Sequence, residues 1–120
     1  MKEDLHITIA SDKHLHFIPQ IEEALLTASQ QKGTGIAVRS EAYLKEKIMA
    51  GKSVIAYSES GQWAGFCYIE SGGHNKYVAN SGLIVSPAFR GAGLASEIKK
   101  RALELSAKLF PGAKLFGLTT

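Results

Sequence analysis

The chain has 120 residues, of which 45% are hydrophobic and 21% are charged, and its formal net charge is +3. The length suits one domain over residues 1–120, the composition is typical of a globular protein, and no apolar run is long enough to span a membrane. The single cysteine, Cys67, excludes an internal disulfide and a cysteine-rich zinc site, and no apolar segment typical of a secretory signal follows Met1. We therefore expect a cytoplasmic protein with no metal centre and no membrane contact.

The first third of the chain predicts a strand followed by a helix. Polar and apolar side chains alternate over residues 5–9, as in a half-buried strand whose three apolar residues share one face. Ser11 or Asp12 then caps a helix that ends at Gly33 and Gly35. The apolar residues of this helix recur at helical spacing and are Phe17, Ile18, Ile21, Leu25 and Leu26.

A second helix and three strands are predicted in the middle of the chain. The helix begins after Ser40 as its N-cap and ends at Gly51. Its apolar residues are Tyr43, Leu44, Ile48 and Met49. The strands cover residues 53–58, 62–70 and 77–85, with glycine-containing turns between them. Cys67 lies in the second of these strands among aromatic residues, so we interpret it as a small buried hydrophobic side chain.

A long helix and a last strand complete the pattern. The helix covers residues 94–109 and ends at Pro111-Gly112, and a strand follows over residues 114–119. The apolar face of the helix comprises Leu94, Ile98, Ala102, Leu105 and Leu109. The order β-α-α-β-β-β-α-β predicts an α+β fold with a mixed, mostly antiparallel sheet flanked by helices.

Positive charge is concentrated at the end of the chain. Residues 86–120 carry six basic and two acidic side chains, a local charge of +4, whereas the other 85 residues carry eight basic and nine acidic side chains. Such a region favours an anionic ligand or is simply a solvated helix face. Binding of nucleic acid is not expected, because the consecutive Lys99, Lys100 and Arg101 spread over about 200° of the helix and lack interleaved aromatic residues.

A glycine-containing turn joins the strand at 77–85 to the long helix. It points backbone N–H groups and the start of a helix at one place, which is an arrangement that binds phosphate. The same pattern also fits a tight turn that binds nothing. The sequence lacks the Gly-Lys-Ser/Thr ending of a Walker loop, and Ser96 stands where a dinucleotide-binding fingerprint has its third glycine.

The turn resembles the acyl-CoA signature of the GNAT superfamily of N-acyltransferases, Gln/Arg-x-x-Gly-x-Gly/Ala. Every fixed position of that signature is matched by Arg90-Gly-Ala-Gly-Leu-Ala95. The apolar strand before the turn, the amphipathic helix after it and the following strand are similar to the same family. The resemblance covers about Ile7 to Thr120, by pattern more than by motif in the first half.

The resemblance implies a binding site for acetyl-CoA or another acyl-CoA. The backbone N–H groups that would hold the pyrophosphate belong to Gly91, Ala92, Gly93, Leu94 and Ala95. The Ser96 hydroxyl and the Arg90 guanidinium would add donors. Leu83 and Val85 would pair their backbone with the pantetheine arm, and the Leu83 N–H would stabilise the oxyanion formed on the thioester carbonyl.

The implied reaction is acyl transfer to an amine, which needs a general base and an acid for the leaving thiolate. Some family members carry a glutamate four residues before the position of Leu83, but this chain has Ala79 there. Glu70, at the end of a strand, and His74, in the following loop, are the nearest substitutes. Each is alternatively an ordinary solvent-exposed residue.

The family fold continues beyond its fifth strand with a helix and further strands, which this sequence does not contain. We therefore expect that the chain belongs to a longer polypeptide or self-associates through the incomplete edge of its sheet. The function expected from the resemblance is N-acyl transfer, and most simply N-acetyl transfer, to the amine of a small molecule or amino acid. The alternative is a non-catalytic CoA-binding or regulatory module, or an inactive fragment of a longer acetyltransferase.

Overall fold

The computed structural model describes residues 5–30, 40–72, 77–91, 93–112 and 114–117. Within these ranges the predicted order of elements is confirmed. The elements are β1 (Leu5–Ile9), the 3-10 helix η1 (Asp12–Phe17), α1 (Ile18–Ser29), α2 (Glu41–Met49), β2 (Ser53–Ser58), β3 (Trp63–Gly72), β4 (Tyr77–Val85), the 3-10 turn η2 (Pro87–Phe89), α3 (Leu94–Leu109) and β5 (Lys114–Gly117).

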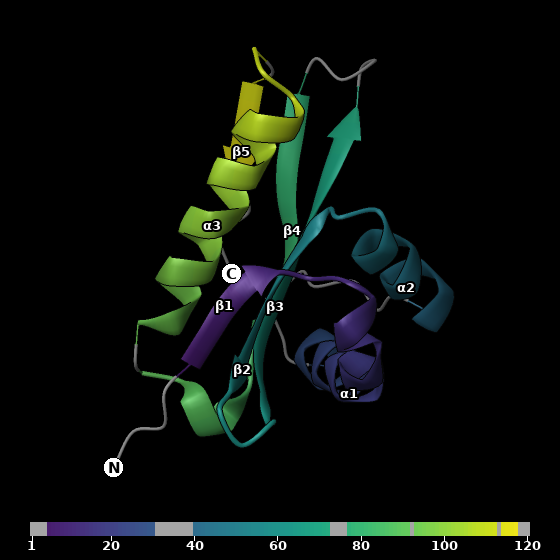
Figure 1. Cartoon of the computed structure of the whole chain (residues 1–120), viewed down its shortest axis with the longest axis vertical. Coiled ribbons are helices and arrows are strands. Elements are labelled where there is room, and N and C mark those ends of the chain that lie inside the picture. The colour runs from purple at the N-terminus through teal and green to yellow at the C-terminus, as the bar shows by residue number, and fades with distance from the viewer. Residues whose placement is uncertain (1–4, 31–39, 73–76, 92, 113, 118–120) are drawn as a thin grey trace.

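The five strands form one sheet in the order β1-β2-β3-β4-β5. The first four are antiparallel neighbours, and β5 is parallel to β4 because α3 connects them by a crossover. Figure 1 shows α3 on one face of the sheet and α1 and α2 on the other. The fold class is thus the predicted α+β type with a mixed, mostly antiparallel sheet.

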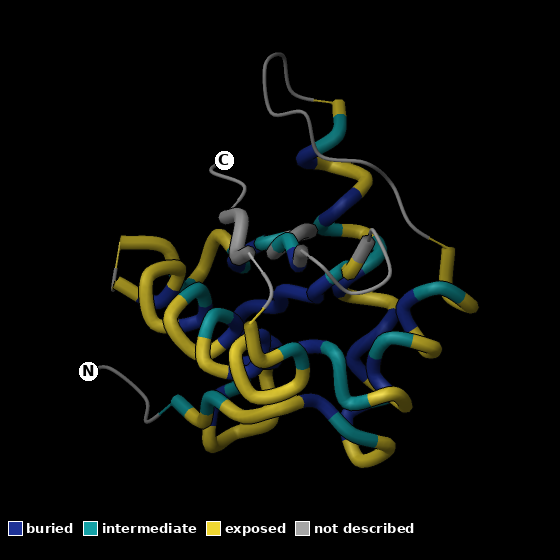
Figure 2. Tube along the Cα trace, turned by 90° about the horizontal axis from the view of Figure 1, so that it is seen from above, coloured by how far each residue is buried: buried dark blue, intermediate teal, exposed yellow. Residues whose placement is uncertain are grey.

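Alternating side chains of the strands fill two cores, one on each face of the sheet, and Figure 2 shows this buried layer between exposed helix surfaces. The core under α1 and α2 includes Trp63, Phe66 and Tyr68 of β3. The core under α3 includes Cys67 and Ile69 of the same strand. Cys67 is 1% exposed, which confirms the interpretation of this residue as a small buried hydrophobic side chain.

Gly65 allows α3 to pack closely on the sheet. A Cβ at this position would lie 2.5 Å from the Cδ1 atom of Ile98, so even alanine would force the Ile98 side chain to shift. The apolar face of α3 is buried as predicted at Leu94, Ile98, Ala102 and Leu105, whereas Leu109 is 41% exposed. This contact holds the start of α3 beside the end of β4, where the candidate site lies.

Capping residues close in sequence determine where α2 begins and ends. The Ser40 Oγ accepts a hydrogen bond from the Tyr43 N–H, so Ser40 is the predicted N-cap. Gly51 has φ +71° and follows the helix as predicted. The N–H groups of Gly51 and Lys52 donate to carbonyls of the last turn, which is the hydrogen-bond pattern of a Schellman motif.

Three apolar residues predicted to be buried lie at the surface instead. Ile9 is 44% exposed, Leu26 is 48% exposed and Met49 is 58% exposed. The apolar face of α1 consists of Ile18, Ile21, Leu25 and Ala28. Its start also differs from the prediction, because Ser11 caps the 3-10 helix η1 and α1 begins only at Ile18. No helix among the described residues is long and apolar enough to cross a membrane.

His14 makes the start of η1 sensitive to pH. It is 8% exposed, and its Nδ1 accepts a hydrogen bond from the Ser11 N–H at 3.0 Å, which requires a deprotonated Nδ1. Burial, followed by the charges of His16 and Lys13, lowers the pKa of His14 below its ordinary value of 6.5.

We expect this histidine to destabilise the fold in acid. Because the unfolded chain binds a proton at higher pH than the folded chain, the free energy of unfolding falls as the pH drops through about 6.5 toward the lower folded pKa. Urea unfolding between about pH 7.5 and about pH 5.5 measures this slope. The slope should flatten in His14→Gln and persist in His16→Gln, since His16 is exposed. An equal slope in both variants would contradict the assignment.

Candidate functional site

The second half of β4 has one free edge among the described residues. The β4–β5 ladder runs from Tyr77↔Lys114 to Asn80↔Gly117 and includes no described residue beyond Asn80. On the other edge, β4 stays paired with β3 as far as Val85↔Gly65. Among the described residues, the last part of β4 therefore has no strand neighbour on the side that β5 occupies further down, and this stretch is the open edge of β4.

Hydrogen bonds near the end of β4 show which backbone groups face this edge. The Ser86 N–H donates to the Ala64 carbonyl of β3 at 2.8 Å, so the neighbouring Val85 backbone points the opposite way. The Val85 carbonyl accepts from the Arg90 Nε at 3.3 Å, which agrees with this direction. Leu83 is half-buried and packs against the core under α3, so its side chain is not an exposed functional group.

An irregularity interrupts the β3–β4 register beside the open edge. Phe66 pairs with Ile84 and Tyr68 pairs with Ser81, so two steps along β3 correspond to three along β4. The extra residue of β4 is therefore Gly82 or Leu83. Bulges of this kind re-aim backbone groups and occur often beside active sites.

The turn after β4 is shaped by two glycines. Gly91 has φ +86° and Gly93 has φ +75°, conformations that other residues rarely adopt. A Cβ at either position would meet nothing within 4 Å, so the space beside both glycines is open. A phosphate can therefore approach the backbone of the turn closely. Ala92, which the sequence also predicts in this site, lies outside the described residues.

Gly93 is also the N-cap of α3 and has no side chain to cap the helix. The first N–H group of α3 that donates a hydrogen bond to the turn belongs to Glu97, and its acceptor is the Gly93 carbonyl. The N–H groups of Leu94, Ala95 and Ser96 form the preceding turn, where helices leave their donors unpaired. The positive end of the helix dipole lies at the same place, so this turn suits an anion.

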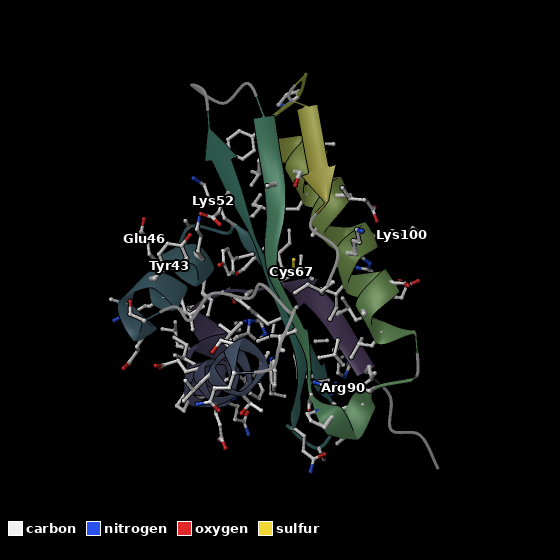
Figure 3. All side chains as sticks on the ribbon, turned by 180° about the vertical axis from the view of Figure 1, so that it is seen from behind. Tyr43, Glu46, Lys52, Cys67, Arg90 and Lys100 are labelled. Atoms are coloured by element: carbon white, nitrogen blue, oxygen red, sulfur yellow. The ribbon has the colours of Figure 1, made fainter. Side chains whose placement is uncertain are left out.

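Arg90 lies between the open edge and the turn, and Figure 3 shows it beside the connection from β4 to α3. Its side chain is exposed, and its Nε is engaged with the Val85 carbonyl. The Nη groups remain as donors, because the structure records no ion pair of Arg90 with a described residue. The structure thus gives Arg90 a bracing contact within the turn that the sequence did not predict.

Glu70 lies near the end of β3 and is half-buried. Residues 66, 68 and 70 alternate onto one face, and Phe66 and Tyr68 belong to the core under α1 and α2. In the β3–β4 register Glu70 is directly opposite Ala79, the position at which the resemblance noted in the sequence implies a glutamate in some family members. Facing residues of antiparallel strands have their Cβ atoms about 4.5–5.5 Å apart, so Glu70 brings a carboxyl group next to that position.

His74, the other candidate base, lies outside the described residues. The sequence did not predict that Glu70 faces Ala79. The short segment between the two strands, which contains Gly72-Gly73, indicates such a pairing. Among the described residues no group of three or more His, Cys, Asp or Glu side chains could hold a metal ion.

The model of the acetyltransferase (GNAT) family matches residues 18–120, which is most of the chain. The chain belongs to the GNAT acetyltransferase family. No curated protein sequence matches this GNAT chain significantly.

Solved structures share the GNAT fold at low sequence identity. Rv2747 from Mycobacterium tuberculosis, solved with CoA, has a TM-score of 0.74 at 19% identity over 95% of this chain and 64% of its own. N-acetylglutamate synthase from Neisseria gonorrhoeae, solved with coenzyme A and N-acetyl-glutamate, has a TM-score of 0.74 at 18% identity over 100% of this chain and 26% of its own. Diaminobutyrate acetyltransferase EctA from Paenibacillus lautus, solved with its substrate L-2,4-diaminobutyric acid and coenzyme A, has a TM-score of 0.71 at 13% identity over 99% of this chain and 68% of its own.

These identities establish a shared fold only. The GNAT chain spans less than two thirds of the length of the first two neighbours, at 64% and 26%.

Proposed function

We propose that this GNAT chain is an N-acyltransferase that moves an acyl group, most simply acetyl, from acyl-CoA to the amine of a small molecule or amino acid. The observation that carries the proposal is the open edge of β4 running directly into an uncapped helix start with two positive-φ glycines. The CoA-bound structures of its neighbours support the donor, and the amino-acid ligands of two of them support the class of acceptor.

The cofactor half of the proposed site is built from backbone groups. The N–H groups of the turn, from Gly91 to Ala95, and the Ser96 hydroxyl hold the pyrophosphate, where glycine backbone and helix dipole both favour negative charge. Leu83 and Val85 offer backbone donors and acceptors to the amides of the pantetheine arm, as an added strand would. The arm thereby extends along β4 from the turn toward Glu70.

The proposed chemistry uses the Leu83 N–H and the Glu70 carboxylate. Glu70 takes a proton from the acceptor amine, directly or through a water, and the amine nitrogen forms a bond to the thioester carbon. The Leu83 N–H donates to the carbonyl oxygen as negative charge develops there. The carbon–sulfur bond then breaks, and the leaving thiolate takes up the proton that the attacking nitrogen loses as the amide forms. His74 is the second candidate for the base.

The Arg90 guanidinium should strengthen acetyl-CoA binding in two ways, as a donor to phosphate and as a brace on the Val85 carbonyl. We expect Arg90→Ala to weaken acetyl-CoA binding by about tenfold to a hundredfold, the effect of losing a hydrogen bond to a charged group. Isothermal titration calorimetry measures the change. Lys100→Ala is the control, because Lys100 is exposed on α3 away from the turn (Figure 3). An effect of Arg90→Ala below about twofold would show that the brace and the phosphate contact are both dispensable.

A non-catalytic CoA-binding module is the second candidate, and Ala79 at the position of the family's glutamate favours it. The two functions are separated by measuring CoA release from acetyl-CoA with a panel of α-amino acids and diamines. Turnover that depends on one class of amine supports the transferase. Tight binding of acetyl-CoA with no turnover for any amine would overturn the transferase and leave the binding module.

A further inference from the structure

A cavity of about 270 Å³ lies between α1 and the β4–α3 connection. It is lined by Glu23, Ala24 and Thr27 of α1, by Trp63 at the start of β3, and by Pro87 and Arg90 of the connection. Its volume is close to the lower end of the range for small-molecule sites, which begins at about 300 Å³. The cavity is on the side of the turn that faces α1.

The cavity has opposite charges on its two sides. Glu23 comes from α1 and Arg90 comes from the connection, and both line the same space. Among the described residues, neither side chain has an ion pair that would neutralise its charge. A molecule that carries one cationic and one anionic group would complement this pair.

Trp63 supplies apolar surface to the cavity. It is 6% exposed, and its Nε1 is buried without a hydrogen-bond partner in the described part of the chain. Because this nitrogen is shielded from solvent, the part of the indole that lines the cavity is its carbon surface. The indole, Pro87 and Ala24 also give the cavity apolar surface for an aliphatic group.

From this juxtaposition we infer that the cavity binds a free aliphatic α-amino acid. Arg90 holds the carboxylate, and Glu23 holds the ammonium group. The aliphatic side chain packs on the indole and Pro87. This inference goes beyond acyl transfer and does not depend on it.

The cavity is separate from the place where an acceptor amine would react. Ser86, which also lines the cavity, directly follows β4 and is seven residues from Ala79, the partner of Glu70. At about 3.3 Å per residue of extended chain, the cavity and Glu70 lie beside parts of this segment that are roughly 23 Å apart. Because Arg90 serves both the cavity and the turn, the amino acid and acetyl-CoA should each alter the affinity of the other without excluding it.

Trp63 is the single tryptophan of the chain, so its fluorescence reports directly on the cavity. We expect L-leucine to change this emission saturably in the millimolar range. L-leucinamide lacks the carboxylate and N-acetyl-L-leucine lacks the ammonium group, and each should bind at least about fivefold more weakly than leucine, since each loses a charge-assisted contact. Glu23→Gln should weaken the binding of leucine by a similar factor and leave the affinity for N-acetyl-L-leucine unchanged. Glu22→Gln, at the neighbouring position of α1, should change neither affinity.

Three outcomes would overturn the inference. They are the absence of a saturable change with leucine, equal binding of leucine and its two analogues, and competitive displacement of leucine by acetyl-CoA. The third outcome would assign the cavity to the acyl-CoA site. Gly93→Val separates the two sites further, because it should impair acetyl-CoA binding and preserve the leucine response.

Discussion

Replacement of Gly93 by valine is expected to weaken acetyl-CoA binding by at least about a hundredfold. The Cβ of the new residue would project into the open space beside the turn, and its branches would keep a phosphate away from the N–H groups of Leu94 and Ala95. Loss of two hydrogen bonds to a charged group costs about 3–6 kcal/mol, which corresponds to this factor or more. Calorimetric titration with acetyl-CoA measures the affinity.

Valine at a positive φ also strains the backbone, so the variant needs a matched control. Gly51 has φ +71°, close to the +75° of Gly93, and a Cβ there also meets nothing within 4 Å. Gly51→Val therefore carries a similar strain at the end of α2, far along the chain from the turn. We expect both variants to lose stability and only Gly93→Val to lose acetyl-CoA. Equal affinity of the two variants would remove the turn from the acyl-CoA site.

The elements that could be predicted from sequence are those whose ends are set by local chemistry. The N-cap Ser40 and the positive-φ Gly51 delimit α2, and both act on their own helix. Pro87 and Gly93 likewise set the end of β4 and the start of α3. The glycine signature could be recognised in the sequence because a phosphate-binding turn depends on a positive-φ backbone conformation, and glycine is the residue that permits this conformation.

Features that depend on packing between distant segments could not be predicted. The periodicity of α1 includes Leu26, but the sheet covers only a narrower face of that helix, so Leu26 is exposed. The facing pair Glu70 and Ala79 depends on strand register, which the turn between β3 and β4 and the irregularity beside Leu83 decide together. The Arg90 contact with Val85 depends on the path of η2 after the strand ends.

Replacement of Glu70 by glutamine is expected to lower kcat for acetyl transfer by about 10²–10⁴-fold, the usual contribution of a positioned general base. The acetyl-CoA affinity should not change, because Glu70 lies seven or more residues along the sheet from the phosphate turn. Steady-state kinetics with the preferred amine and calorimetry with acetyl-CoA give the two numbers. Glu46→Gln is the control, since Glu46 is an exposed carboxylate on α2 on the same side of the sheet (Figure 3).

The pH dependence distinguishes a base from a residue that merely supports the strand. A general base is needed only while the acceptor amine is protonated, so the defect of Glu70→Gln should shrink as the pH rises toward the pKa of that amine. A structural defect would persist at every pH and would also appear as a lower free energy of unfolding. A pH-independent loss of kcat with normal stability would contradict Glu70 as the base and turn attention to His74. An unchanged kcat would show that the reaction does not need the Glu70 carboxylate as its base.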